Sequence, residues 1–213
     1  MNYIPMLFEN DDCIVLNKPA GLSVQGGKRV GISLDTILGE CWSPRPLLVH
    51  RLDKDTSGAI LVAKTKEAAV LFAALFAGGK AGSRGMTKQY CGVCAGRPGM
   101  DTGCIRLDLD IRGKVKPSET RYKRLSGGHD FSFLELELGT GRMHQIRRHL
   151  AHIGNPILGD DKYGDFTLNK ELRKTRGLKQ LLLHASRLVI DEGLIGFPLD
   201  ITAPLPEYFQ PWT

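Results

Sequence analysis

The sequence lacks a cysteine framework and a long hydrophobic run. Its five cysteines are odd in number, so a disulfide-stapled secreted domain is not expected. No stretch approaches the roughly 18 consecutive apolar residues that a membrane span needs. Residues 1–10 also lack the basic region and apolar core of a secretion signal. These absences predict a cytoplasmic protein with no membrane attachment.

Internal repeats, low-complexity tracts and long linkers are absent as well. With 213 residues, 42% of them hydrophobic and 24% charged, the chain has the length and composition of a globular protein with one core. We therefore expect a single domain over residues 1–213. The net charge of +6 favours a polyanionic partner, with nucleic acid ahead of a membrane surface. No obligate protein partner is evident, and a monomer is expected.

Hydrophobic patterning divides the chain into short elements. Strands are expected at residues 12–17, 88–95, 105–111, 120–125, 131–138 and 181–190. Ser33 and Thr65 are placed to cap helices over 34–42 and 66–77, and a third helix is expected over 141–153. The second helix is expected to bury Val70, Leu71, Ala74 and Leu75, and to stop at Gly78 and Gly79. Together these elements predict an α+β fold with a largely antiparallel mixed sheet flanked by helices.

The polar segment HRLDKDTSG, residues 50–58, lies between two apolar runs at 47–49 and 59–63. Both runs are predicted to be buried strands, with Gly58 providing turn chemistry between them. A carboxylate fixed in such a loop, Asp53, with Arg51 two residues before it, is a candidate nucleophile or acid/base group. The alternative is a solvated charged turn.

The segment GRMHQIRRHL, residues 141–150, contains a second candidate. On a helix, Met143, Ile146, Leu150 and Ile153 would form one apolar stripe. Arg147 falls on the flank of that stripe, where a partly buried charge needs a partner. A carboxylate of the site is the obvious candidate for that partner.

Several segments, in order along nearly the whole chain, resemble the motifs of the RluA-type pseudouridine synthases. They are KPAGL at 18–22, HRLDKDTSG at 50–58, KQY at 88–90, GRMHQIR at 141–147, GNPILGDDKYG at 154–164 and LHA at 183–185. The resemblance implies the pseudouridine synthase fold and an enzyme that isomerises specific uridines of rRNA or tRNA. That reaction breaks and remakes a glycosidic bond without redox change or phosphate energy, so neither a cofactor nor a metal is expected.

The resemblance also implies a role for each site residue. Asp53 is the catalytic carboxylate, acting as a nucleophile at uracil C6 or ribose C1′ or stabilising a cationic sugar. Arg51 helps to hold the target nucleotide out of the helix, because a stacked uridine cannot present its reactive atoms. Tyr90 stacks on the flipped uracil, and Leu183 lines the uracil pocket. Arg147 pairs with Asp53 and orients it.

Only seventeen residues precede Lys18, so no separate N-terminal RNA-binding domain is expected. Basic residues at 112–124 and 170–179 are candidate RNA contacts, or else a solvated face. Two other functions compete with the synthase. One is a magnesium-dependent phosphatase of the haloacid dehalogenase type, suggested by Asp53-x-Asp55; the other is a non-catalytic RNA-binding protein.

Overall fold

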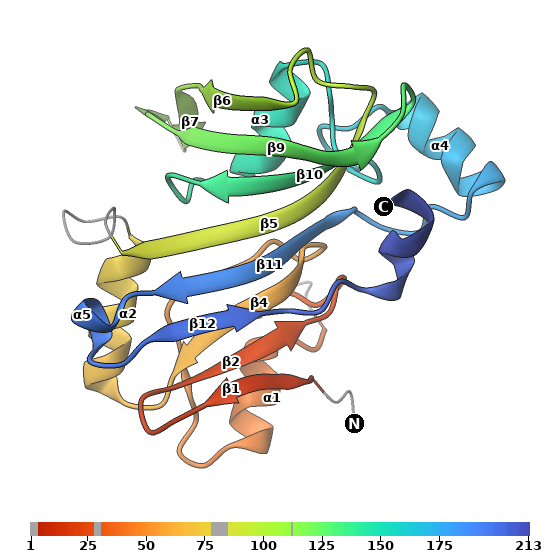
Figure 1. Ribbon diagram of the computed structural model, residues 1–213. Helices are drawn as coiled ribbons and strands as arrows, with labels where there is room; N and C mark the ends of the chain where they lie inside the picture. The colour runs from red at the N-terminus through yellow and green to blue at the C-terminus, as the bar shows by residue number, and fades with distance from the viewer. Residues whose placement is uncertain (1–3, 28–30, 78–84, 112) are drawn as a thin grey trace. The chain divides into compact units, whose positions relative to one another are not determined.

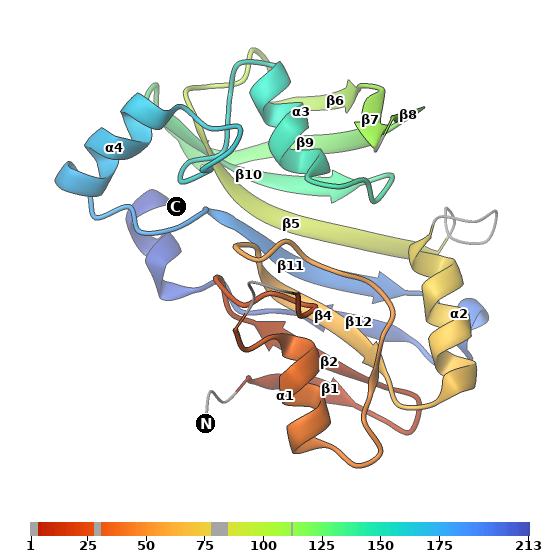
Figure 2. The ribbon, with the colours of Figure 1, turned by 180° about the vertical axis from the view of Figure 1, so that it is seen from behind.

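The computed structural model describes residues 4–27, 31–77, 85–111 and 113–213, and Figures 1 and 2 show it from opposite sides. The expected helix stop at Gly78 and Gly79, and Arg112 among the candidate RNA contacts, lie outside the described residues. The chain divides into two compact units. The first unit comprises Met1–Lys88 and Ala185–Pro204, and the second comprises Gln89–His184 and Leu205–Thr213. The single domain expected over residues 1–213 stays a prediction.

The first unit is built on a sheet with the strand order β1-β2-β4-β11, to which β3 adds beside β4 and β12 beside β11. The bounds are β1 Met6–Glu9, β2 Cys13–Lys18, β3 Leu47–Leu48, β4 Ser57–Ala63, β11 Leu183–Ile190 and β12 Leu199–Thr202. The pairs β1–β2, β2–β4, β3–β4 and β11–β12 are all antiparallel. Every residue of β4 is buried, so the strand that follows the Asp53 loop is packed on both faces.

The helices of the first unit are α1 Leu34–Cys41, α2 Lys66–Phe76 and α5 Glu192–Ile195. Both predicted caps are confirmed, because the side chains of Ser33 and Thr65 accept hydrogen bonds from the third residue after them.

The face that α2 buries differs from the prediction. Ala68, Phe72 and Leu75 pack into the core, whereas Val70 and Leu71 are 74% and 40% exposed. The large ring of Phe72 occupies the core side, and this turns the neighbouring valine and leucine toward solvent.

The second unit contains an antiparallel sheet with the strand order β5-β10-β9-β6 and a separate two-stranded sheet, β7-β8. The strands are β5 Met86–Ala95, β6 Thr102–Arg106, β7 Leu109–Ile111, β8 Lys114–Lys116, β9 Glu119–Gly127 and β10 Phe131–Leu138. The single strand expected over 105–111 is therefore wrong, since β6 ends at Arg106 and β7 pairs with β8 in a separate sheet. The α+β class with a largely antiparallel sheet is confirmed.

Two apolar clusters hold this unit together, one on each side of the alternating strands. Leu134 and Leu136 of β10 pack with Ile146 and Leu150 of α3 (Gln145–His152), which covers one face of the sheet in Figure 2. On the other side, Val93 of β5 joins residues from α4 (Phe166–Thr175) and η1 (Glu207–Trp212). No helix within the described ranges is both long and apolar enough to cross a membrane.

Candidate functional site

The start of the Asp53 loop is fixed by His50. Its Nε2 atom accepts a hydrogen bond from the N–H of Leu61 at 2.9 Å, and its ring stacks on Phe76 with centroids 3.8 Å apart. Burial, with a smaller effect from Lys88, lowers the pKa of His50 to about 3. The imidazole is therefore neutral at physiological pH, with its proton on Nδ1, and it anchors the loop rather than transferring protons.

The end of the loop is fixed by Gly58. Its φ of +111° favours glycine, and a Cβ atom there would lie 2.2 Å from the carbonyl oxygen of Ala185. Any side chain at residue 58 would therefore force β4 away from β11. This close approach to the main chain of Ala185 explains why the HRLDKDTSG segment ends in glycine.

The turn between these anchors places Asp53. The N–H of Thr56 donates to the carbonyl of Asp53 at 3.2 Å, and the N–H of Gly21 donates to the carbonyl of Lys54 at 3.0 Å. Leu52 is buried, Asp53 is half-buried and Arg51 is exposed. Main-chain hydrogen bonds and the burial of Leu52 thus hold the loop in place. Asp53 itself is only partly covered.

Lys18, the last residue of β2, is completely buried against this turn. Its Nζ donates to the carbonyls of Pro19 and Leu22 at 2.9 Å each and to that of Lys54 at 3.0 Å. Burial lowers the pKa of Lys18 to about 8, against the opposing effects of Asp55 and Asp53. In the sequence, Lys18 stands out only as the first residue of the KPAGL motif.

In the second unit, Arg147 pairs with Asp160. Nε and Nη2 of Arg147 donate to the two carboxylate oxygens of Asp160 at 2.8 and 2.7 Å, and Nη2 also reaches Asp161 at 3.2 Å. Arg147 is 5% exposed and Asp160 is 0% exposed. The buried charge that needs a partner, predicted from the helical spacing, is therefore present, and Asp160 is a partner that the spacing did not reveal.

The Asp160 carboxylate is fully engaged. Besides Arg147, its Oδ1 accepts from the N–H groups of Lys162 and Tyr163 at 2.8 and 2.9 Å. Burial raises the pKa of Asp160, but the hydrogen bonds from Arg147, Tyr163 and Lys162 outweigh it and hold the pKa below its usual value. In the sequence, this partner is the first aspartate of the GNPILGDDKYG motif, which lies thirteen residues after Arg147.

Two further contacts support the same corner of the second unit. The buried Asn169 accepts from the N–H of Gly159 at 2.8 Å and donates to the carbonyl of Asp160 at 3.0 Å. His144 has a left-handed backbone, with φ 53°, and its Nδ1 lies 3.0 Å from the hydroxyl of Tyr163. Such a conformation is uncommon outside glycine, and it occurs at the residue that immediately precedes α3.

The remaining predicted residues lie in the second unit. Leu183 is 3% exposed within the apolar cluster that contains Leu136 and Ile146, and Tyr90 packs partly buried against that cluster. The structure therefore places Tyr90, Leu183 and Arg147 in one unit, and Asp53 and Arg51 in the other. The pairing of Arg147 with Asp53 stays a prediction.

The candidate RNA contacts differ along the chain. On β9, Arg121 is exposed and forms ion pairs with Glu119 and Glu137 at 2.8 and 3.0 Å, which cancel part of its charge. The helix α4 begins at an unpredicted cap, Asp165, and carries Lys170 and, in its last turn, Arg173 and Lys174. Their role in RNA binding stays a prediction.

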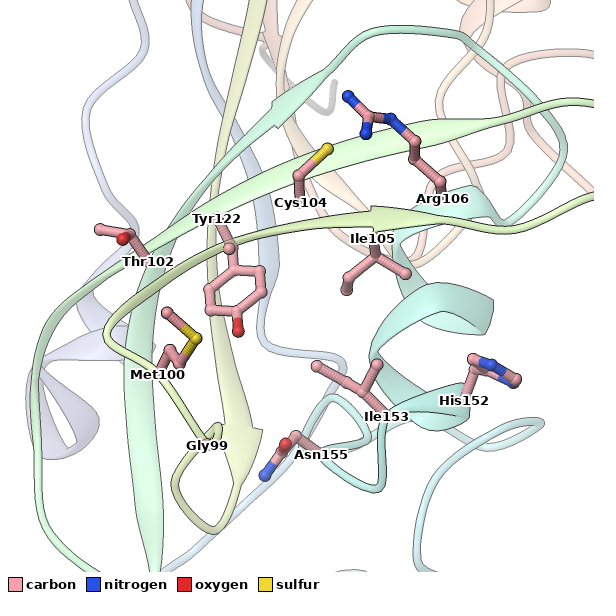
Figure 3. Close-up of a pocket in the computed structure, with 11 residues that line it drawn as sticks. Gly99, Met100, Thr102, Cys104, Ile105, Arg106, Tyr122, His152, Ile153 and Asn155 are labelled. Atoms are coloured by element: carbon pink, nitrogen blue, oxygen red, sulfur yellow. The ribbon is translucent and has the colours of Figure 1, made fainter.

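A pocket of about 470 Å³ opens beside β6 in the second unit and contains none of the predicted site residues. Figure 3 shows Ile105, Tyr122 and Ile153 turned into it, whereas Cys104 and Arg106 point the other way. No group of three or more His, Cys, Asp or Glu side chains that could hold a metal occurs within the described residues.

Comparison with known proteins gives a consistent result. Residues 12–152 match the RNA pseudouridylate synthase family. The ribosomal large subunit pseudouridine synthase C of Rickettsia typhi is 35% identical over 96% of this chain and 69% of its own length, and that of Yersinia pestis is 36% identical over 94% and 65%. The solved structure of human RNA Pseudouridylate Synthase Domain Containing 4 is similar with a TM-score of 0.80, 26% identity and coverage of 96% of this chain and 90% of that one. These matches replace the phosphatase interpretation.

Proposed function

The chain belongs to the RluA-type RNA pseudouridine synthases, which are isomerases, and from this membership we propose that it converts specific uridines of large-subunit rRNA to pseudouridine with Asp53 as the catalytic carboxylate. The names of the bacterial relatives favour large-subunit rRNA over tRNA as the substrate. RNA is the expected partner in either case, which agrees with the net charge of +6.

The observation that carries the proposal is the construction of the Asp53 loop. The loop is held at His50, at Lys54 and at Gly58, yet Asp53 is only half-buried. A surface turn that served only as a connection would not need three anchors around one acid. A rigid loop holding an accessible carboxylate is what positioning at a reacting carbon requires.

The proposed reaction has three stages. The target nucleotide leaves the stack, at a cost of a few kcal/mol, and Arg51 helps to hold it out. The uracil stacks on Tyr90 beside Leu183, an arrangement in which a flat ring shields the base from water. Asp53 then attacks uracil C6 or ribose C1′, or stabilises the cationic sugar, while the N1–C1′ bond breaks and the C5–C1′ bond forms. Any bond formed to Asp53 is broken again, C5 loses its proton, and N1 takes up a proton. The composition of the nucleotide is unchanged, so no co-reactant is consumed.

The test is Asp53→Asn. Asparagine keeps the shape of the side chain but lacks the negative charge, so the variant is expected to form no pseudouridine. It should still bind substrate RNA within about tenfold of wild type, or roughly 1.4 kcal/mol. Pseudouridines are mapped by reverse transcription after carbodiimide treatment, on large-subunit rRNA and on tRNA, with circular dichroism to verify folding.

Asp55→Asn is the matched control, because it removes a carboxylate from the same turn. It should stay active at neutral pH. Conversion by Asp53→Asn at a rate near wild type would contradict the catalytic assignment, and modification of tRNA alone would contradict the choice of rRNA.

A further inference from the structure

The helix α4 and the loop after it carry most of the net positive charge of the chain. Residues 166–179 contain five Lys or Arg and one Glu, a net charge of +4 against +6 for the whole chain. All five cations are exposed. Three of them, here termed the α4 cations, lie on the helix itself: Lys170, Arg173 and Lys174. Both views show α4 at the periphery of the second unit (Figures 1 and 2).

The α4 cations differ from the arginines of the neighbouring sheet in having no acidic partner. On β9, the exposed Arg121 pairs with Glu119 and Glu137 at 2.8 and 3.0 Å. No ion pair joins an α4 cation to an acid within the part of the chain that the structure describes. The positive charge of this helix is therefore left facing solvent, where it is available to an anion from outside the chain.

The spacing of the α4 cations costs the helix stability. Lys170 lies three residues before Arg173 and four before Lys174, so the three side chains are neighbours on the helix surface, where like charges repel. The helix dipole favours the cations of the last turn, Arg173 and Lys174, but its effect does not extend back to Lys170. A bound polyanion would remove the repulsion among all three.

The opposite side of α4 is anchored in the second unit. Leu168 and Leu172 pack against the apolar cluster that contains Val93. The buried Asn169 accepts from the N–H of Gly159 at 2.8 Å and donates to the carbonyl of Asp160 at 3.0 Å. The α4 cations therefore project from a helix whose position is fixed relative to the loop that pairs with α3.

This anchoring also distinguishes between two kinds of polyanion. A basic amphipathic helix binds an anionic membrane by inserting its apolar face, but Leu168 and Leu172 of α4 are already engaged in the core. Phe166, which is 61% exposed, is the one large apolar side chain that α4 presents to solvent among its described residues. A phosphate backbone requires only surface cations, so RNA fits this helix better than a membrane does.

We propose that the α4 cations form a binding surface for the phosphate backbone of the rRNA substrate. This inference rests on the proposed function. Phosphate contacts position an RNA without reading its sequence, so α4 would supply affinity while other residues select the uridine. The α4 cations touch no reacting atom in this scheme. Their removal should therefore weaken binding and leave the rate of bound RNA unchanged.

The first experiment replaces all three α4 cations together, as Lys170→Ala, Arg173→Ala and Lys174→Ala in one chain. Its Kd for an in vitro transcript of large-subunit rRNA should rise about 10- to 100-fold at about 0.1 M KCl. The slope of log Kd against log salt should fall by about 2 to 3, since each lost phosphate contact removes about 0.7 to 0.9. The single-turnover rate at saturating RNA should stay within about threefold of wild type, and circular dichroism verifies folding.

The control replaces three cations of the first unit with alanine, each of which pairs with an acid: Arg45, Lys64 and Arg187. Both triple variants have the same net charge, three units below the +6 of wild type. The control should keep a Kd within about threefold of wild type and the wild-type salt slope. If the α4 variant and the control have equal salt slopes, net charge alone accounts for RNA binding and the proposal is overturned.

A second measurement uses wild type alone, and so covers the case in which the α4 variant does not fold. Exposed amines are acetylated with an N-hydroxysuccinimide ester, with and without saturating rRNA, and each site is quantified by mass spectrometry. Lys170 and Lys174 should react at least about fivefold more slowly when RNA is bound. Lys66, an exposed lysine of the first unit, monitors consumption of the reagent. Unchanged reactivity of Lys170 and Lys174 would overturn the proposal.

The two proposals fail in different ways. If wild type makes no pseudouridine in rRNA, the proposed function itself is wrong. If wild type modifies rRNA but the α4 variant binds it as tightly, only the role of α4 is wrong. Sedimentation with phosphatidylserine vesicles tests the other polyanion: vesicle binding that the α4 variant loses, with unchanged RNA affinity, would assign the helix to a membrane and overturn the proposal.

Discussion

The two compact units each bury a long cationic side chain, and they stabilise it in different ways. In the first unit, Lys18 donates to three main-chain carbonyls and has its pKa lowered to about 8. In the second, Arg147 meets the carboxylate of Asp160 through two parallel hydrogen bonds of 2.8 and 2.7 Å. One cation is therefore surrounded by dipoles, and the other is paired with an opposite charge.

The difference matters because lysine and arginine respond differently to burial. A guanidinium group stays charged at any physiological pH, and its planar fork matches a carboxylate. The Arg147–Asp160 pair is thus a permanent brace between α3 and the 160–163 loop. The ammonium group of Lys18 has a pKa within reach of mildly alkaline pH, so its charge is adjustable. The Arg147–Asp160 pair should therefore stabilise the fold at any neutral or alkaline pH, whereas the contribution of Lys18 to stability should change with pH.

The largest expected effect on stability comes from breaking the brace. Asp160→Asn removes the buried carboxylate that accepts two hydrogen bonds from Arg147, and removing one member of a buried ion pair costs about 3–5 kcal/mol. We expect a loss of that size in the free energy of unfolding, measured by urea denaturation at pH 7. Because the pKa of Asp160 is lowered, its stabilising contribution is present above about pH 4 and is lost as the pH falls through the folded-state pKa.

Asp161→Asn is the control for this prediction. Asp161 also contacts Arg147, at 3.2 Å, but its side chain is 74% exposed. Solvent screens such a contact, so the loss should stay within about 0–1 kcal/mol. Equal losses in the two variants would show that burial of the Asp160 pair does not set the stability of the second unit.

A smaller effect is expected from Lys18 at alkaline pH. Its pKa is about 8 in the folded chain and 10.5 as the reference value, so the unfolded chain binds more protons between these two values. Stability must then rise with pH across that window, by roughly 3 kcal/mol at most. The free energy of unfolding of wild type, measured at pH 7.5 and pH 10.5, should increase relative to that of Lys18→Met.

Lys64→Met serves as the reference for the alkaline titration of the remaining groups, because Lys64 is partly exposed and forms an ion pair with Glu9 near the surface. Its stability should follow that of wild type over the whole range. Parallel curves for wild type and Lys18→Met would mean that the pKa of Lys18 is not lowered on folding.

The fold was largely predictable from the sequence because its signals are local. Strand β10 has the predicted bounds, residues 131–138, since alternating apolar residues determine which face of a strand is buried. Ser33 and Thr65 were correctly identified as caps, because a capping side chain bonds to an N–H only three residues away. The prediction of one strand over 105–111 was wrong because the alternation of apolar and polar residues continues across a break between two different sheets.

The site was less predictable because its main contacts join distant residues. Spacing showed that Arg147 needed a partner, but not that the partner is Asp160 in the following loop. Lys18 and the carbonyl of Lys54 are 36 residues apart, and a main-chain acceptor leaves no trace in side-chain identity. The buried face of α2 is set by the position of its largest apolar residue, and helical periodicity alone does not identify that face.

The smallest effect concerns a neutral group of the second unit, the ring of Tyr90. Tyr90→Phe keeps the flat ring that is proposed to stack on uracil, so its activity should stay close to that of wild type. Tyr90→Ala removes the ring and should lose about 1–3 kcal/mol, the usual value of stacking one base on an aromatic side chain. Single-turnover rates and RNA affinity on the same rRNA transcript measure both.

Tyr122→Ala is the matched control, since Tyr122 packs partly buried against the same apolar cluster as Tyr90. Both alanine variants lose a ring from that cluster, so their melting temperatures should fall by similar amounts. Only Tyr90→Ala should lose activity beyond what its stability explains. If Tyr90→Phe is as impaired as Tyr90→Ala, the hydroxyl matters rather than the ring; if Tyr122→Ala is equally impaired, packing of the cluster accounts for the loss and stacking on Tyr90 does not.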